Sequence, residues 1–288
     1  MNFRYVNSRG EILDFSEFPY LFQSGDLVNY SWKYDSSNNR ITNVRRETGE
    51  RPFKVGLIPD WSLPYAEKRA ALKEAAEHLF NVIEYDVINN ADGRIETDTG
   101  SYFPCRILAS DKSDWEKPTA YMFHDLTAVS GKNAWISEQD FSFYPAVSET
   151  VSESEHSVAK FLDYAFDYDF EYTPQQTGRG SLNISHLETS DFKLTIFGPC
   201  NNPRILIAGH PYEVFTSLRN GEYLVIDSRN NTVMKYLSNG TQESVYDLRG
   251  KVNTAFEKIP PGYSQVSWDG TFGFNLTVFL ERSEPLWI

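Results

Sequence analysis

The residues best suited to chemistry form a carboxylate row in the second half of the chain. From Asp163 to Tyr172 the sequence DYAFDYDFEY alternates acidic or small residues with aromatic ones over ten positions. Because neighbouring side chains of a strand point to opposite faces, this period of two predicts a strand with one aromatic face and one carboxylate face. Carboxylates two positions apart are rooted ~6.5–7 Å from each other, whereas Ca²⁺ needs several oxygens at ~2.3–2.6 Å from different directions. We therefore interpret the row as a solvated strand face, with a calcium site as the alternative, and assign no metal ligand.

Catalytic patterns are missing from the sequence. It holds no GxSxG, P-loop, GxGxxG or HExxH motif. Paired carboxylates could serve a glycosidase and aromatic rings could stack on sugars, but with 40 acidic residues such neighbours arise by chance. We therefore expect no enzyme and assign no catalytic or cofactor-binding residue; the ligand-binding residues stay unknown.

The histidines and tryptophans are interpreted as structural residues. The five histidines are scattered along the chain, so each is expected to be solvated or to make local hydrogen bonds: His78, His124, His156, His186 and His210. The tryptophans are expected to be core or interface anchors: Trp32, Trp61, Trp115, Trp135, Trp268 and Trp287.

Cysteine usage and hydropathy indicate an ordinary soluble chain. Cys105 and Cys200 are the two cysteines and lie far apart in sequence, so free buried thiols are expected rather than a disulfide or a zinc site. The N-terminus MNFRYVNSRGE lacks a signal-peptide core, and no run of ~18 apolar residues predicts a membrane span.

The net charge argues against nucleic-acid binding. The net charge is −13, with 16 basic and 23 acidic residues in 1–150 and 11 and 17 in 151–288. An evenly acidic chain has no basic footprint for phosphates. The charge is interpreted as favouring solubility, or as an acidic surface that DNA slides past without sticking.

One long helix stands out in a chain otherwise made of strands. Ser62 to Ile83 is predicted to be helical, with Ser62 as the N-cap and Pro64 in the first turn. Its expected buried stripe is Tyr65, Leu72, Ala75, Ala76, Leu79 and Ile83. A single amphipathic helix needs a sheet to pack on, so the first half is predicted to be one helix on a β-sandwich or curled sheet.

Short strands separated by turns fill the rest of the chain. Predicted strands in the first half include 3–6, 12–15, 27–34, 41–46, 53–58, 84–88, 100–110, 121–129 and 135–144. Residues 145–157, PAVSETVSESEHS, are rich in Ser and Glu and form the best linker candidate. Beyond them, turn signals every eight to twelve residues, such as Asn220-Gly221 and Asn239-Gly240, predict an antiparallel sandwich or jelly roll.

The order of these segments resembles the distal tail protein (Dit) of long-tailed, non-contractile phages and prophages of Gram-positive bacteria. In the first half the resemblance rests on VNSRGEILDF (6–15), WKYDSSNNRI (32–41), NVIEYDV (81–87) and SYFPCRILASDKSDW (101–115). In the second half it rests on residues 182–214, GEYLVIDSRNNTV (221–233), FEKIPPG (256–262) and the terminal ERSEPLWI. It therefore spans nearly the whole chain.

The resemblance implies a mainly β chain of two domains. Residues 1–147 would be a ring-forming, tail-tube-like β domain with the helix near 62–83, and residues 148–288 a galectin-like antiparallel β-sandwich. It further implies a homo-hexameric ring in the virion tail tip that joins the tail tube protein to the tail-associated hub or tail fibre protein and anchors receptor-binding proteins. No catalysis, sequence-specific nucleic-acid binding or membrane insertion is implied. The alternative is a carbohydrate-binding module for host attachment.

Overall fold

The computed structural model describes residues 1–60, 62–113, 121–146 and 178–287. The chain divides into two compact units, Met1–Glu138 with Leu280–Ile288, and Gln139–Phe279. The predicted linker at 145–157 falls almost entirely outside the described residues, as does the strand predicted at Asp163–Tyr172. The division into 1–147 and 148–288 therefore stays a prediction.

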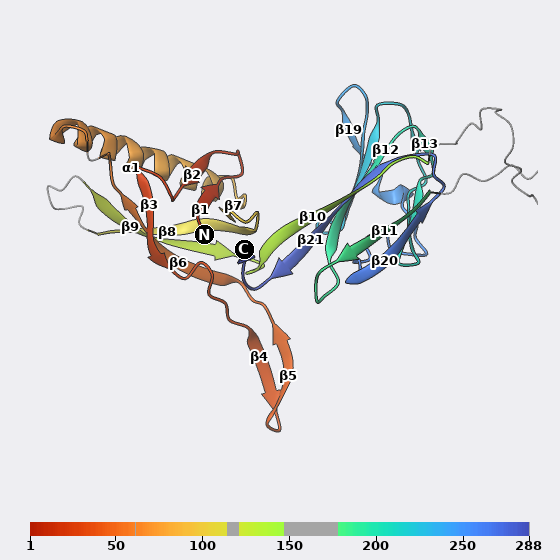
Figure 1. Cartoon of the computed structure of the whole chain (residues 1–288), viewed down its shortest axis with the longest axis horizontal. Coiled ribbons are helices and arrows are strands. Elements are labelled where there is room, and N and C mark those ends of the chain that lie inside the picture. Colours follow the sequence, from red (N-terminus) through yellow and green to blue (C-terminus); the bar gives the residue numbers. More distant parts are fainter. Residues whose placement is uncertain (61, 114–120, 147–177, 288) are drawn as a thin grey trace, which may run out of the picture. The chain divides into compact units, whose positions relative to one another are not determined.

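The first unit is built on antiparallel strands around one helix (Figure 1). Its body strands are β1 (Phe3–Val6), β2 (Ile12–Asp14), β3 (Tyr20–Gly25), β6 (Gly49–Leu57), β7 (Gly93–Thr97), β8 (Tyr102–Ser113) and β9 (Met122–Ser130). They pair in the order β2-β1-β7-β8-β9-β6-β3. The long β8 belongs to two runs of strands, because it pairs with β7 in its first half and with β9 in its second. The β8–β9 pairing begins at Arg106 and contains a register shift between Ile107 and Ala109.

Helix α1 (Tyr65–Ile88) covers this sheet and packs on β2, β6 and β8. Its buried positions repeat at spacings of three and four: Leu72, Ala75, Leu79, Val82, Ile83 and Asp86. The five apolar residues of this set join Tyr5, Leu13, Phe53 and Trp135 in one hydrophobic cluster. Burying each large apolar side chain contributes ~1.5–3 kcal/mol, so packing holds this helix in place. The predicted helix on a curled sheet is confirmed.

The predicted helix ends were wrong at both sides. Pro64 occupies the N-cap and makes no side-chain capping bond, so Ser62 is not the cap, and Tyr65 is 55% exposed rather than on the buried stripe. Residues 84–88, predicted to be extended, form the last turn of α1. The buried Asp86 explains this extension, because its carboxylate accepts hydrogen bonds from the Tyr5 hydroxyl and from the backbone N–H and hydroxyl of Ser8. The hydrogen bond to Asp86 and burial raise the pKa of Tyr5.

Among the described residues, the second unit contains two larger antiparallel sheets and the two-stranded sheet β13–β16. One of the larger sheets has the order β19-β18-β17-β12-β21 and the other β11-β20-β14-β15. The bounds are β11 (Gly178–Ile184), β12 (Asp191–Phe197), β13 (Cys200–Asn201), β14 (Arg204–Ile207), β15 (His210–Glu213), β16 (Ser217–Leu218), β17 (Tyr223–Asp227), β18 (Thr232–Tyr236), β19 (Gln242–Ser244), β20 (Gly262–Trp268) and β21 (Phe274–Arg282). A short 3₁₀ helix, η1 (Tyr246–Leu248), follows β19. β10 (Trp135–Phe143) and β21 include the points at which the chain passes between the units.

The inner faces of the two sheets form one core. The ring centroids of Phe192 in β12 and Tyr212 in β15 are 5.1 Å apart, and those of Trp268 in β20 and Phe274 in β21 are 5.1 Å apart. Such contacts between sheets define a β-sandwich. A mainly β chain with one long helix is confirmed, and so is the antiparallel second half. The galectin-like character of the sandwich stays a prediction.

The two thiols are free and buried, as predicted. Burial raises the pKa of the Cys200 thiol to about 11 and raises that of Cys105 further. Neither thiol is therefore reactive at neutral pH. Among the described residues, no helix is long and apolar enough to cross a membrane.

Candidate assembly site

A β-hairpin arm leaves the body of the first unit. We define the arm as β4 (Lys33–Ser37) and β5 (Arg40–Arg45), which pair with each other in a separate two-stranded sheet (Figure 1). Asn38 and Asn39 join them in a two-residue turn with φ of 50° and 59°. Asparagine tolerates positive φ better than most residues, and two such residues match the twist of a hairpin. The sequence NNR therefore fixes the end of the arm.

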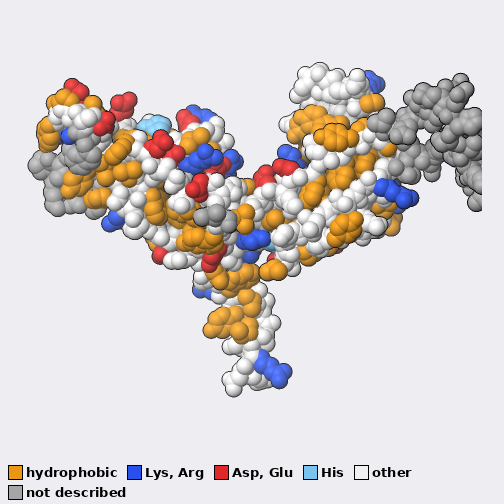
Figure 2. All heavy atoms as spheres, viewed as in Figure 1, with side chains coloured by type: hydrophobic (Ala, Val, Ile, Leu, Met, Phe, Trp, Pro, Cys, Tyr) orange, Lys and Arg blue, Asp and Glu red, His pale blue; other side chains and the backbone are white. Residues whose placement is uncertain are grey.

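The two faces of the arm differ in chemistry. Tyr34 lies opposite Val44 and Ser36 lies opposite Ile41, and opposed residues share a face. Tyr34, Ile41 and Val44 thus form the apolar face, with exposed fractions of 63%, 65% and 50%. Figure 2 shows these hydrophobic side chains gathered along the arm, with basic atoms near its end. Every residue of both strands is exposed, so the structure buries neither face.

The opposite face is polar and internally paired. The Arg45 guanidinium binds the carboxylates of Asp35 at 2.7 Å and Glu47 at 3.0 Å, and these partners raise its pKa. The Asn43 amide donates to Asp35 at 3.3 Å. Lys33 lies opposite Arg45 on the same face. Solvated charges suit water, whereas an exposed aromatic and two exposed aliphatic side chains do not.

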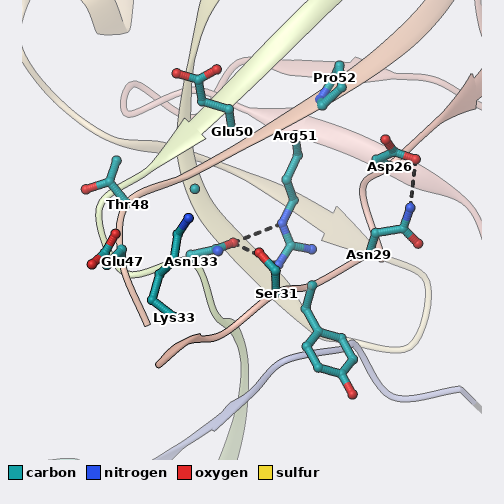
Figure 3. Close-up of a pocket in the computed structure, with 12 residues that line it drawn as sticks. Asp26, Asn29, Ser31, Lys33, Glu47, Thr48, Glu50, Arg51, Pro52 and Asn133 are labelled. Atoms are coloured by element: carbon teal, nitrogen blue, oxygen red, sulfur yellow. Dashed lines mark hydrogen bonds between the residues drawn. The ribbon is translucent and has the colours of Figure 1, made fainter. Parts of the chain in front are cut away.

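Arg51 anchors the base of the arm. Its side chain is 2% exposed and lies 4.3 Å from the centroid of the Phe103 ring. It donates to the Leu27 carbonyl, which also accepts from the Trp135 indole at 3.3 Å, and to Asn133 (Figure 3). Burial lowers the pKa of Arg51 to about 10, so the guanidinium is charged at neutral pH. These bonds tie the segment before β4 to the core of the unit.

A shallow cavity of about 370 Å³ lies beside this anchor (Figure 3). It is lined by Asp26, Asn29, Tyr30, Ser31, Lys33, Glu47, Thr48, Gly49, Glu50, Arg51, Pro52 and Asn133. Gly49 is required there, because a Cβ at this position would overlap the Asn133 side chain. The cavity thus belongs to the root of the arm, and most of the residues that line it are polar or charged.

A second set of contacts holds the strand ends of the arm. The Arg46 guanidinium lies 4.6 Å from the centroid of the Trp32 ring and 3.6 Å from the Glu281 carboxylate. The Trp32 indole donates to the Ser283 hydroxyl at 3.1 Å, and Lys132 binds Glu281 at 3.0 Å. Both strands are therefore fixed where they leave the unit, which presents the arm at a defined position.

The structure does not bring the histidines together into one site. His78 bonds the Tyr20 hydroxyl at 2.8 Å, His124 the Ser110 hydroxyl at 3.2 Å and His210 the Thr254 carbonyl at 2.8 Å. His186 accepts from the backbone of Glu188, so local hydrogen bonding is confirmed for these four histidines. Among the described residues no three His, Cys, Asp or Glu side chains are grouped to hold a metal ion. His156 and the Asp163–Tyr172 carboxylates lie outside the described part of the chain.

The described tryptophans differ in burial. Trp135 and Trp268 are buried, Trp32 packs at the root of the arm, and Trp287 is 57% exposed. Trp61 and Trp115 lie outside the described residues. The sequence predicted one strand over residues 27–34, whereas β4 spans Lys33–Ser37. The sequence pattern that indicates the arm is a pair of apolar residues before the turn, Trp32 and Tyr34, followed by Ile41 and Val44 after it.

A mainly β chain of this topology has the fold of the distal tail proteins found in phage baseplates. The structure matches that of phage SPP1 Dit (gp 19.1), described as "a Paradigm of Hub Adsorption Apparatus in Gram-positive Infecting Phages", with a TM-score of 0.59, 9% identity and coverage of 97% of this chain and 98% of that one. It also matches chains of the phage P2 baseplate in its activated conformation with Ca and with Sr, with TM-scores of 0.60 and 0.58, identities of 11% and 10%, and 99% of both chains covered in each case. No family model and no curated protein match the sequence. The predicted resemblance is confirmed at the level of the fold.

Proposed function

We propose that this chain is a structural protein of a phage tail tip, where copies of it form a hexameric ring. In this proposal the ring joins the tail tube to the tail-associated hub and anchors receptor-binding proteins, and the protein carries out no reaction. The match over nearly the full length to SPP1 Dit and to phage P2 baseplate chains supports this role. We expect the virion to be encoded by a phage that infects a Gram-positive bacterium or by a prophage in the genome of such a bacterium.

The uncovered apolar face of the arm carries the proposal. An isolated two-stranded hairpin is at best marginally stable in water. This one is held at its root and exposes Tyr34, Ile41 and Val44 to solvent. Burying each side chain against a partner would contribute up to ~1.5–3 kcal/mol. A protein–protein contact that buries this apolar face would therefore stabilise the arm and would account for its exposed apolar residues.

A second copy of the chain is the partner that fits best. A head-to-tail ring needs two different patches on each subunit, because one surface of a copy binds another surface of the next. The first unit offers a second uncovered apolar patch on α1, made of Phe80, Val87 and Ile88, with exposed fractions of 54%, 42% and 73%. We assign this patch as the counterpart of the arm of the neighbouring copy.

Charge supports the same assembly. Lys33 and Arg40 are exposed basic residues on the polar side of the arm, whereas Arg45 is already paired with Asp35 and Glu47. On α1, Glu84 lies between Phe80 and Val87 in sequence, and Glu77 is paired with Lys73 at 3.6 Å. The last turn of α1 carries no basic residue. Opposite charges beside two apolar patches favour their encounter and set their orientation. The overall net charge of −13 suits a ring through which DNA passes without binding.

Light scattering after size exclusion, combined with negative-stain imaging, tests the ring. We expect the purified full chain to form six-fold rings whose fraction falls on dilution. Sizing must therefore cover a wide concentration range, because subunits held by modest patches separate when dilute. A strict monomer at the highest concentration, with no rings in the images, would contradict self-assembly.

A further inference from the structure

One face of the second unit carries a groove unrelated to the arm. It has a volume of about 1180 Å³ and lies on the outward face of the β11–β20–β14 sheet. Alternation explains its lining: Leu182, Val266 and Ile205 are buried in the sandwich, so the residues between them point outward. The outward set that lines the groove is Arg179, Ser181, Arg204, Leu206, Tyr263, Gln265 and Ser267.

The strand register arranges these side chains in rows. Arg179 in β11 lies opposite Ser267 in β20, and Ser267 lies opposite Leu206 in β14. Ser181 lies opposite Gln265 in the next outward row. Tyr263 stands one outward row further along β20, about 13 Å from the row of Arg179 at the usual rise of a strand. The groove therefore has an aromatic end, a polar middle and a basic end.

The lining suits a carbohydrate. Tyr263 is 69% exposed and offers a flat apolar ring with a polar tip, against which the C–H face of a sugar ring can stack. The Gln265 amide and the Ser181 hydroxyl lie between the two ends, and the Ser267 hydroxyl lies beside Arg179. Amide and hydroxyl groups both donate and accept hydrogen bonds, as sugar hydroxyls do.

The basic end selects an anionic ligand. Arg204 is 3.5 Å from the Glu213 carboxylate, whereas Arg179 forms no ion pair within the described residues. A guanidinium binds carboxylate or phosphate through two parallel hydrogen bonds. Asp269 is the one carboxylate among the described lining residues, and it is occupied by the backbone and hydroxyl of Thr271 at 2.9 and 2.8 Å. Since glycoside cleavage requires a pair of carboxyl groups, the groove is built to bind and not to cleave.

We propose that this groove binds an anionic oligosaccharide, with a sugar ring stacked on Tyr263 and a phosphate or carboxylate held by Arg179. A span of about 13 Å between the two groups fits several linked sugars rather than one. The inference goes beyond ring assembly, because it concerns the other unit and needs no contact between copies.

Titration calorimetry of the full chain with three polysaccharides tests the proposal: neutral dextran, polygalacturonate for carboxylate, and phosphomannan for phosphate. We expect binding to at least one of the two anionic polymers and none to dextran. Tyr263→Ala should weaken that binding about tenfold, which corresponds to ~1.4 kcal/mol. Arg179→Ala should weaken it several-fold at low salt and should remove most of its salt dependence, because screening acts on the charged contact.

Matched variants on other surfaces of the same unit are the controls. Tyr144 is 77% exposed and Arg219 is exposed, and neither lines the groove. Tyr144→Ala and Arg219→Ala should bind as the unaltered chain does, and all four variants should unfold at the same temperature. Failure of both anionic polymers to bind, or equal binding by the Tyr263 and Arg179 variants, would overturn the proposal. Binding of dextran as tightly as the anionic polymers would overturn the role of Arg179.

Discussion

Arg51 and Asn133 are joined by two hydrogen bonds, from Nε and Nη2 of Arg51 to Oδ1 of Asn133 at 3.2 and 3.0 Å. Because Arg51 is buried, these bonds satisfy donors that have little access to water. The pair links β6 to the turn before β10, and the bond from Arg51 to the Leu27 carbonyl adds the segment that leads into the arm. One side chain therefore connects the core to the proposed contact surface.

Removing the Asn133 amide should destabilise the first unit. Asn133 has a φ of 44°, so Asn133→Gly deletes the side chain without adding backbone strain. The variant leaves buried donors of Arg51 unpaired, and we expect the free energy of unfolding to fall by ~1–3 kcal/mol in urea titrations. Asn133→Asp keeps an acceptor and should lose less. Equal stability of Asn133→Gly and the unaltered chain would show that Arg51 does not depend on this bond.

Changing the apolar face of the arm should separate assembly from folding. Tyr34→Ser with Val44→Ser removes two side chains that are exposed in the single chain, so unfolding of the single chain should change little. We expect light scattering to show loss of the ring. The control is Ser37→Ala with Asn43→Ser on the opposite face, which removes no charge and should assemble normally. If both double variants assemble alike, the apolar face is not the contact.

The α1 patch should behave as the other half of the same contact. Phe80→Ser removes an exposed ring, and burial of a Phe contributes ~1.5–3 kcal/mol. We therefore expect the concentration at which rings dissociate to rise by about tenfold or more in a dilution series. Val252→Ser, which removes a 95% exposed apolar side chain in the second unit, is the control and should leave the series unchanged. If rings of the Phe80 variant dissociate at the same concentration as rings of the control, the arm of the neighbouring copy binds another surface.

Local patterns in the sequence predicted much of the fold. The strands predicted at 3–6 and 135–144 correspond to β1 (Phe3–Val6) and β10 (Trp135–Phe143). The end of α1 could not be predicted, because residues 84–88 look extended until the Asp86 carboxylate is placed against Tyr5 and Ser8. Those partners are about 80 residues away in sequence, and no periodicity encodes such a contact.

The candidate surfaces were less predictable than the strands. The amphipathic alternation of the arm is visible in the sequence, but the same alternation fits a strand whose apolar face is covered by its own chain. The structure shows that no described element covers Tyr34, Ile41 and Val44. Likewise, Tyr263 and Arg179 are 84 positions apart in sequence, and the pairing of β11 with β20 brings them to one face.

His124 should give the fold a measurable dependence on pH. It is 2% exposed, its Nε2 has no hydrogen-bond partner within the described residues, and burial together with the nearby Lys112 lowers its pKa to about 4 against the opposing charge of Asp125. The unfolded chain takes up this proton near pH 6.5 while the folded chain does not. The contribution of His124 to stability is therefore fully present above pH 6.5, is lost as the pH falls toward about 4, and is constant below that.

His124→Asn isolates this contribution, since carboxylates also titrate in the same range. Urea unfolding of both proteins between pH 7 and pH 4 should show a steeper loss of unfolding free energy in the unaltered chain than in the variant. His78→Asn, which replaces an exposed histidine on α1, should follow the unaltered chain. Parallel curves for the unaltered chain and His124→Asn would mean that the imidazole takes up its proton over the same pH range in the folded and unfolded chains. In that case burial of His124 does not control its charge.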